Sequence, residues 1–207
     1  MPTAIPTFID IPNVDYHLEL IDRNSGERLH ELYKNAQGDP AIEREFGDTI
    51  AFYTRSRQAA IERAEQLYAS HPSDRLGYLI MKTSIDKSSG MTFLGLTDRQ
   101  ILLPDESVVE LPGINFSTWL LASSRHQRVR TNIGNQVNDI GRQLSHDSTQ
   151  ERTDWLGRFL FTGIRRTNSS SQAAVRALGF DRIGVSVNDV AFDTWMTQAD
   201  FAKLTQL

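Results

Sequence analysis

The chain has 207 residues, 39% apolar and 23% charged, a composition typical of a globular protein with one domain-sized core. It has no cysteine, which excludes disulfides, thiolate nucleophiles and cysteine zinc sites and is compatible with a cytoplasmic location. It has 26 acidic and 22 basic residues, and the resulting net charge of −4 argues against a dedicated nucleic-acid-binding protein. No apolar run approaches the roughly 18 residues of a membrane span, and the opening residues lack the basic and apolar regions of a secretory signal.

The first half of the sequence predicts an extended arm followed by a strand, two helices and a hairpin. Pro2, Pro6 and Pro12 remove backbone donors and fix φ, so we expect residues 1–14 to form an arm and residues 15–207 to form the domain. The elements expected after the arm are a strand at 16–20, a helix that starts at Ser25 and ends at Gly38–Pro40, a helix from about Ser56, strands at 77–83 and 91–96 joined by a turn at 85–90, and a polar excursion at 97–110.

The second half alternates strands with helices. Its elements are a strand at 114–121, a basic loop at 125–130, a helix from about Asn132 to His146, a strand at 158–165, a helix at 168–178 and a last hairpin at 180–187 and 190–196. We find no internal repeat and no low-complexity segment. This order predicts a single α+β domain with a central mixed, mostly antiparallel sheet flanked by helices.

The stretch from Asn168 to Phe180 carries the most information. As a local structure it is a helix that Asn168 or Ser169 caps and Gly179 ends, with small alanines that permit close packing. It also resembles the late signature of the GNAT superfamily of acyl-CoA-dependent N-acetyltransferases. In that signature an Asn at a strand exit is followed three residues later by a Ser, here Ser171, and a Leu-Gly-Phe closes the helix.

Two further stretches agree with this resemblance, which extends over Tyr16–Met196. Residues 90–96 look like the second hairpin of the family, and residues 114–122 look like its central strand, with Trp119-Leu120 where members carry an aromatic element. The opening strand, the paired helices and the arginine-rich helix near Arg57 resemble the branch that acetylates ribosomal-protein amino termini.

The resemblance implies that a strand, a turn and a helix start present backbone N–H groups to the pyrophosphate of acetyl-CoA. In family members this loop has the pattern Arg or Gln, two residues, Gly, one residue, then Gly or Ala. Larger side chains at the last two positions would block the close approach of the pyrophosphate to the backbone. Two registers place residues of this chain at those positions: His126, Val129 and Thr131 in one, or Gln127, Arg130 and Asn132 in the other. Neither register supplies two glycines, so the loop departs from the pattern.

This departure has two interpretations. In the first, backbone donors still bind the cofactor, and Arg125, Arg128 and Arg130 add charge-assisted contacts. In the second, Val129 and Arg130 crowd the pyrophosphate, and cofactor binding is weak or lost. Three arginines at a helix start, where the helix dipole disfavours cations, indicate that an anion is expected there.

The resemblance also implies direct attack of a neutral amine on the thioester, with a base, an acid for the leaving thiolate, and backbone N–H groups within 119–122 that polarise the carbonyl. The family often places a Glu as base on the central strand; the matching residue here is Asn115, which cannot accept a proton at neutral pH, and Glu110 is the fallback. Ser171 is the candidate donor to the leaving sulfur, and its alternative role is that of a hydroxyl on the helix surface. Asn168 is expected to hold the pantetheine arm.

The sequence therefore predicts an acetyl-CoA-dependent N-acetyltransferase whose partners are acetyl-CoA and a primary amine, either a protein amino terminus or a small molecule. The alternative is a GNAT-like module without turnover. No metal site is expected, and the protein is expected to be a monomer or a homodimer. We expect the groove for acetyl-CoA to lie between strands 114–121 and 158–165, and the acceptor pocket to come from residues 24–70 and 188–196. The residues expected to bind acetyl-CoA are Trp119, Leu121, Gln127, Arg128, Val129, Arg130, Thr131, Asn132, Asn168 and Ser171.

Overall fold

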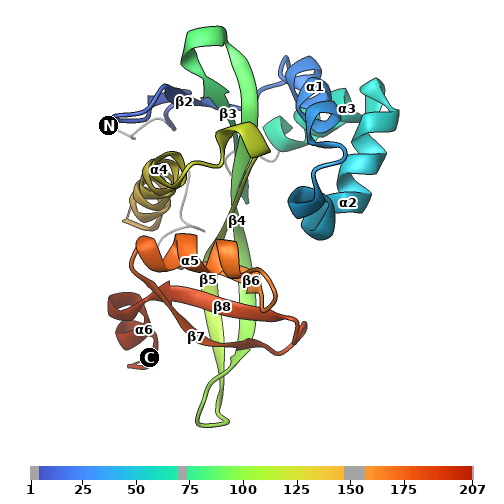
Figure 1. Ribbon diagram of the computed structural model, residues 1–207. Helices are drawn as coiled ribbons and strands as arrows, with labels where there is room; N and C mark the ends of the chain where they lie inside the picture. The colour runs from blue at the N-terminus through green and yellow to red at the C-terminus, as the bar shows by residue number, and fades with distance from the viewer. Residues whose placement is uncertain (1–4, 70–73, 147–156, 207) are drawn as a thin grey trace. The chain divides into compact units, whose positions relative to one another are not determined.

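The computed structural model describes residues 5–69, 74–146 and 157–206 of the 207-residue chain (Figure 1). Eight strands form a sheet in the order β1-β2-β3-β4-β5-β6-β8-β7, with an added pairing between β4 and β7. The pairs β1–β2, β2–β3, β4–β7, β6–β8 and β7–β8 are antiparallel and β5–β6 is parallel, which confirms the predicted mixed, mostly antiparallel sheet and the α+β class. In chain order the elements are β1 (Phe8–Asp10), β2 (Tyr16–Leu20), α1 (Gly26–Ala36), α2 (Pro40–Arg55), α3 (Arg57–Ala69), β3 (Arg75–Lys82), the 3₁₀ turn η1 (Thr83–Ile85), β4 (Lys87–Leu102), β5 (Val108–Leu120), the 3₁₀ turn η2 (Ala122–Ser124), α4 (Gln127–His146), β6 (Phe159–Arg165), α5 (Ser169–Ala177), β7 (Phe180–Ser186), β8 (Phe192–Thr197) and α6 (Gln198–Leu204).

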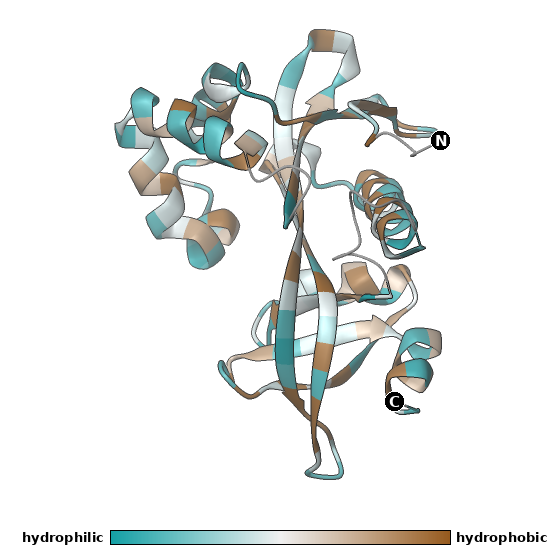
Figure 2. Cartoon of the chain, turned by 180° about the vertical axis from the view of Figure 1, so that it is seen from behind, coloured by the Kyte–Doolittle hydropathy of each residue, from teal (hydrophilic) through white to brown (hydrophobic). Residues whose placement is uncertain are grey.

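The chain divides into two compact units. The first comprises Met1–Phe93 and Thr118–Asn132, and the second comprises Leu94–Ser117 and Ile133–Leu207. The strands β4 and β5 and the helix α4 each contribute residues to both units. Polar and apolar residues are interleaved along these two long strands (Figure 2).

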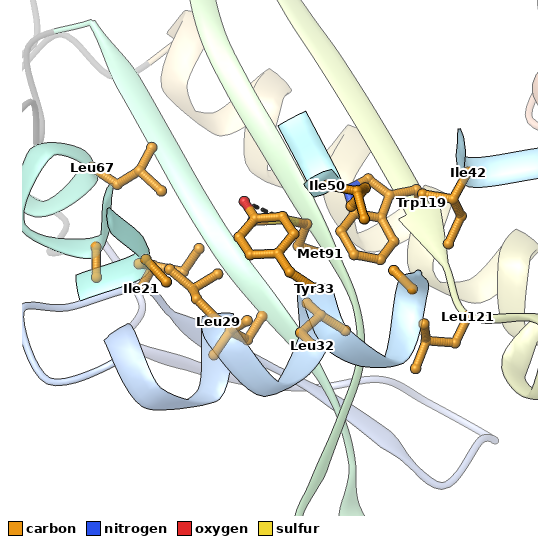
Figure 3. Close-up of a cluster of buried hydrophobic side chains, with 14 of the residues drawn as sticks. Ile21, Leu29, Leu32, Tyr33, Ile42, Ile50, Leu67, Met91, Trp119 and Leu121 are labelled. Atoms are coloured by element: carbon orange, nitrogen blue, oxygen red, sulfur yellow. Dashed lines mark hydrogen bonds between the residues drawn. The ribbon is translucent and has the colours of Figure 1, made fainter. Parts of the chain in front are cut away.

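The first unit is built on strands β1 to β3, with helices α1 to α3 packed around one apolar cluster. One apolar stripe of α1, which consists of Leu29, Leu32, Tyr33 and Ala36, is buried. In Figure 3 the Tyr33 hydroxyl points at the Met91 sulfur. The remaining buried members of the cluster are Ile21, Ile42, Ile50, Ala60, Ala64, Leu67, Leu79, Met81, Trp119 and Leu121.

The arm predicted for the first fourteen residues contributes the strand β1. Its three residues pair with β2, and the ring of Phe8 stacks on the ring of His17 with the centroids 4.5 Å apart. The expected strand at 16–20 is confirmed as β2, which pairs with β3 in a register that places Tyr16 opposite Lys82. The Tyr16 hydroxyl donates to the Ser124 hydroxyl at 3.1 Å, so β2 is tied to the segment that follows β5.

The second unit contains a short parallel pairing. Strands β5 and β6 pair over three residue pairs, from Gly113 opposite Phe159 to Asn115 opposite Phe161, although β5 continues to Leu120 and β6 to Arg165. The β4–β7 pairing closes β4, β5, β6, β8 and β7 into a ring of hydrogen-bonded neighbours.

The structure contains two helices, α2 and α6, that the sequence does not predict. The sequence predicts a helix end at Gly38–Pro40 and no helix over residues 40–55, because Gly-Asp-Pro is typical of the end of a helix. Asp39 is instead the N-cap of α2, with its side chain accepting from the N–H groups of Ala41 and Ile42, and Pro40 occupies the first helical position, where its missing donor costs nothing. The short helix α6 was also missed; Thr197 caps it by accepting from the Asp200 N–H.

Further corrections concern element boundaries. Helix α4 begins at Gln127 rather than near Asn132, because Val129 extends the buried apolar stripe by one turn. Residues 87–90, expected to be turn, and residues 97–102, expected to be part of a polar excursion, belong to the 16-residue strand β4. The turn before β4 is instead made by η1 and by Asp86, whose φ of 45° lies in the left-handed region.

Candidate functional site

In the first unit, the end of β5 is held to the start of α2 by a single arginine. The Arg125 Nε donates to the Leu120 carbonyl at 2.7 Å, and its Nη2 donates to the Asp39 Oδ2 at 2.6 Å. The other carboxylate oxygen of Asp39 accepts from the first turn of α2, at 3.1 Å from Ala41 and 3.4 Å from Ile42. One carboxylate therefore caps a helix and binds an arginine that also satisfies a strand carbonyl.

This arrangement is largely removed from water. The side chains of Arg125 and Asp39 are 21% and 9% exposed. Burial alone would raise the pKa of the Asp39 carboxyl, but the hydrogen bond and charge of Arg125, with the two amides of α2, outweigh it and hold that pKa below its usual range. Asp39 is thus a fixed anion near neutral pH, and Arg125, which was expected to contact a phosphate, is already engaged.

A cavity of about 710 Å³ opens beside this pair; we call it the α2 cavity. It is lined by Asn35, Gln37, Gly38, Asp39, Pro40, Ala41, Arg44, Lys87, Leu121, Ala122, Ser123 and Arg125. A smaller cavity of about 360 Å³, the α1 cavity, is lined by Glu27, Arg28, Glu31, Asn35, Asp86, Lys87 and Ser88. The two share Asn35 and Lys87 and so adjoin each other.

The start of α4 carries most of the residues predicted to bind acetyl-CoA. Because the Arg130 N–H is the first to bond back, to the His126 carbonyl, the amides of Gln127, Arg128 and Val129 precede the helical ladder. Gln127 and Arg128 are exposed. Such amides, together with the helix dipole, can bind an anion.

The side chains around this helix start point in different directions. Val129 is 6% exposed and belongs to the buried face of α4. Arg130 is half-buried, and burial together with the nearby charge of Arg125 lowers the pKa of its guanidinium. Thr131 is half-buried, and the Asn132 amide donates to the Pro12 carbonyl at 3.0 Å, which ties α4 to the N-terminal arm.

The two predicted binding residues at the end of β5 lie in different environments. Trp119 is buried near Tyr33 (Figure 3). The centroid of its ring lies 6.3 Å from that of Tyr33 and 6.5 Å from that of Phe46. Leu121 lines the α2 cavity, and its N–H donates to the Ser89 carbonyl at 2.8 Å.

In the second unit, Asn168 and Ser171 lie at the start of α5. The Asn168 Oδ1 accepts from the Ser171 N–H at 3.1 Å, so Asn168 is the helix cap that the sequence analysis described. The Gln172 amide donates to the Arg166 carbonyl at 2.9 Å and secures the passage from β6 into α5. Ser171 itself is half-buried.

The two candidate bases, Asn115 and Glu110, lie on the β5 part of the second unit. Glu110 is exposed, whereas the Asn115 Oδ1 is buried and has no hydrogen-bond partner among the described residues. An interval of five residues on a regular strand puts the two side chains on opposite faces. The structure therefore does not bring them together.

The α2 cavity contains functional candidates that the sequence analysis did not name, above all Arg44 and Lys87. Both fall in segments whose structure was mispredicted: Arg44 lies on the missed helix α2, and Lys87 begins the strand β4 where a turn was expected. The Asp-Pro start signal before α2 could have placed Arg44 one turn into a helix. Among the described residues, no group of three or more His, Cys, Asp or Glu side chains is arranged to hold a metal ion, and no described helix is long and apolar enough to cross a membrane.

Comparisons with known proteins bear on the fold. No model of a known protein family and no curated protein matches the chain. Among solved structures, RimL, a ribosomal L7/L12 α-N-protein acetyltransferase in complex with coenzyme A, matches with a TM-score of 0.64 and 16% identity over 93% of this chain and 99% of that one. The microcin C7 self-immunity acetyltransferase MccE, in complex with acetyl-CoA and AMP, matches with a TM-score of 0.62 and 17% identity over 92% and 96% of the two chains.

A third match is the ribosomal-protein-S5-alanine acetyltransferase from Vibrio fischeri, with a TM-score of 0.60 and 12% identity over 96% of this chain and 97% of that one. These likenesses cover nearly the whole chain. The chain has the fold of the GNAT acetyltransferases, as the resemblance in sequence implied.

Proposed function

We propose that the protein transfers an acetyl group from acetyl-CoA to a primary amine. The observation that carries this proposal is the fold, which matches acetyltransferases solved with coenzyme A or acetyl-CoA over more than nine-tenths of both chains. Two features of the chain support it: the three-pair parallel register of β5 with β6, and the start of α4, where backbone amides precede the helical ladder.

The residues that would hold the pyrophosphate of the cofactor belong to the start of α4, in the first unit. The amides of Gln127, Arg128 and Val129 would take the pyrophosphate, with the exposed Arg128 guanidinium adding a charge-assisted contact. Asn168, the cap of α5 in the second unit, stays the residue predicted to hold the pantetheine arm. One of the two registers places Val129 where the family has a glycine. The Val129 side chain faces the core, so that register would not need a glycine there.

The backbone at the end of β5 would polarise the thioester carbonyl. The Leu121 N–H is taken by Ser89, and successive residues of a strand direct their amides to alternate sides. The Leu120 N–H therefore points away from β4, and the Arg125 bond to the Leu120 carbonyl fixes the orientation of that residue. A fixed N–H donor stabilises the oxyanion that forms when an amine attacks the acetyl carbon.

Proton transfer would depend on the acceptor more than on a dedicated base. Acetyl-CoA supplies the thioester; the attacking amine loses a proton, and the leaving thiolate gains one, for which Ser171 is the proposed donor. The carboxylate lining the α2 cavity, Asp39, has a lowered pKa and is already bonded to Arg125, so it is a poor base. We expect kcat/KM to rise with pH along the acceptor amine's own pKa, near 8 for a peptide amino terminus. A profile that keeps one fixed pKa when the acceptor is changed would instead assign a base on the protein.

The second candidate function is a GNAT-like binding module without turnover. It is favoured by Asn115, which stands where the family often carries a glutamate, and by the loop without two glycines. Calorimetric titration with acetyl-CoA distinguishes the two: tight binding supports the enzyme, and no detectable heat at high micromolar acetyl-CoA supports the module. A thiol-release assay over a panel of primary amines then tests turnover, and acetyl-CoA binding without thiol release from any amine would refute catalysis.

A further inference from the structure

The α2 cavity differs from the adjoining α1 cavity in how its charges are balanced. In the α1 cavity Glu27 is paired with Arg57, Glu31 with Lys34, and Asp86 with Arg28. Arg28 also binds Glu19. Apart from Lys87, which both cavities share, every charged residue that lines the α1 cavity therefore has a partner within the protein.

In the α2 cavity the charges leave a cationic surplus. Asp39 and Arg125 neutralise each other through their 2.6 Å bond. Arg44 and Lys87 have no ion-pair partner among the residues that the structure describes. The cavity thus presents two exposed, uncompensated cations, one from the first turns of α2 and one from the start of β4.

The uncharged residues that line the α2 cavity also suit an anionic ligand. Asn35, Gln37 and Ser123 supply further donors at the cavity wall. The first amides of α2 are taken by Asp39, so the surplus comes from side chains rather than from the helix start. A volume of about 710 Å³ lies within the usual range of small-ligand sites and has room for a short peptide end.

We infer that the acceptor is a peptide amino terminus that carries an anionic side chain within its first residues, and that Arg44 and Lys87 recognise this anion. The inference rests on the proposed acetyl transfer and narrows its acceptor class. Leu121 and Ala122, which follow the end of β5, line the same cavity. An amine held there is adjacent to the strand end assigned to the thioester, while its anionic side chain meets the two cations.

The shared chemistry of the ligand is a negative charge, which a carboxylate or a phosphate can supply. Tripeptide amides Ser-Glu-Ala, Ser-Gln-Ala and Ser-Lys-Ala differ only in the charge of one side chain, and a fourth peptide with phosphoserine in the middle supplies the phosphate arm. We expect kcat/KM to fall from Glu to Gln to Lys, with about five- to twentyfold between Glu and Lys. This preference should shrink in 0.5 M salt, because exposed charge pairs are screened. Preference for the phosphopeptide over the Glu peptide would assign the site to phosphate.

Single and double variants test whether Arg44 and Lys87 cause the preference for the Glu peptide over the Lys peptide. Arg44→Gln and Lys87→Gln should each remove part of the preference for Glu over Lys, and the double variant should abolish it. Arg55→Gln is the matched control, since Arg55 is exposed at the other end of the same helix and does not line the cavity. Equal rates for the Glu and Gln peptides, or a preference that survives the double variant, would overturn the inference while acetyl transfer stands.

A binding measurement keeps the inference testable without turnover. Fluorescence polarisation of the Glu and Lys peptides, each labelled at its carboxyl end, measures acceptor affinity in the absence of acetyl-CoA. Tighter binding of the Glu peptide that disappears in the double variant supports the site even if no acetylation is detected, in which case the proposed function alone fails. Equal affinities for the two peptides would refute the site.

Discussion

The pair formed by Arg125 and Asp39 is the connection whose removal the structure predicts most sharply. Arg125→Gln removes the donor to the Asp39 carboxylate and withdraws the partner of the Leu120 carbonyl. The remaining carboxylate is 9% exposed and keeps only its two helix amides. Removing one partner of a largely buried, charge-assisted pair costs about 2–4 kcal/mol. For a chain of this size that lowers Tm by about 5–12 °C.

A double-mutant cycle with Asp39→Asn separates the pair from the cap. Asparagine can still accept from Ala41 and Ile42, so this change removes the charge and leaves the capping bonds. We expect a coupling free energy of about 1–2 kcal/mol from urea unfolding followed by tryptophan fluorescence. The same cycle on Arg57 and Glu27, whose side chains are 66% and 53% exposed, is the control and should show coupling within experimental error.

The pH dependence of this effect follows from the lowered pKa of Asp39. A carboxyl whose folded pKa lies below its unfolded value stabilises the fold above about pH 4, and that contribution is lost as the pH falls through the folded pKa. The difference in unfolding free energy between the natural chain and Arg125→Gln should therefore be largest near pH 7 and shrink on acidification from about pH 5. A difference that is independent of pH, or a coupling indistinguishable from the control pair, would show that Arg125 acts through packing alone.

Three further predictions concern the elements around this pair. Gly90→Ala should destabilise the fold by about 2 kcal/mol or more in urea unfolding, because an added Cβ would lie 2.2 Å from the Trp119 carbonyl oxygen. Arg128→Gln should weaken acetyl-CoA binding about three- to tenfold in calorimetry, with Arg55→Gln as the unchanged control; equal affinities would remove Arg128 from the site. Val129→Gly should lower stability by about 2–4 kcal/mol without tightening acetyl-CoA binding, since the side chain it removes is 6% exposed; tighter binding would mean that Val129 does obstruct the cofactor.

Much of the fold could be predicted from the sequence because its strongest signals are local. The apolar stripe of α1, the capped helix that ends at Gly179 and the apolar strand β3 each carry a periodicity that needs no tertiary information. The strand extensions could not be found in this way, since residues 97–100 are polar and β4 runs through them to Ile101, which pairs with Ser186 on β7. Such pairing between distant segments leaves no periodic trace in either one.

The site was less predictable than the fold, for an electrostatic reason. A sequence shows that arginines cluster near the start of α4, but it cannot show which of them have a partner. Arg125 meets a carboxylate 86 residues away in the chain, and this leaves Arg128 as the exposed arginine in the first turn of α4. The helix α2 limited the prediction of the site in a second way. Without that helix, the sequence gives no reason to place its cap residue Asp39 and the cation Arg44 at one cavity.

The lack of glycines before α4 weighs less against cofactor binding once the helix boundary is known. The family pattern keeps side chains away from amides that approach a pyrophosphate, and the sequence placed Val129 or Arg130 at such a position. With α4 starting at Gln127, both residues lie within the helix, and Val129 contributes its side chain to the core rather than to the space in front of the amides. The requirement for glycine holds for a loop that wraps an anion, whereas a helix start presents its amides along the axis, and a side chain that is buried against the core, as Val129 is, does not occupy the space in front of them. What decides between an enzyme and a binding module is therefore whether those amides and Arg128 bind acetyl-CoA, and not the count of glycines.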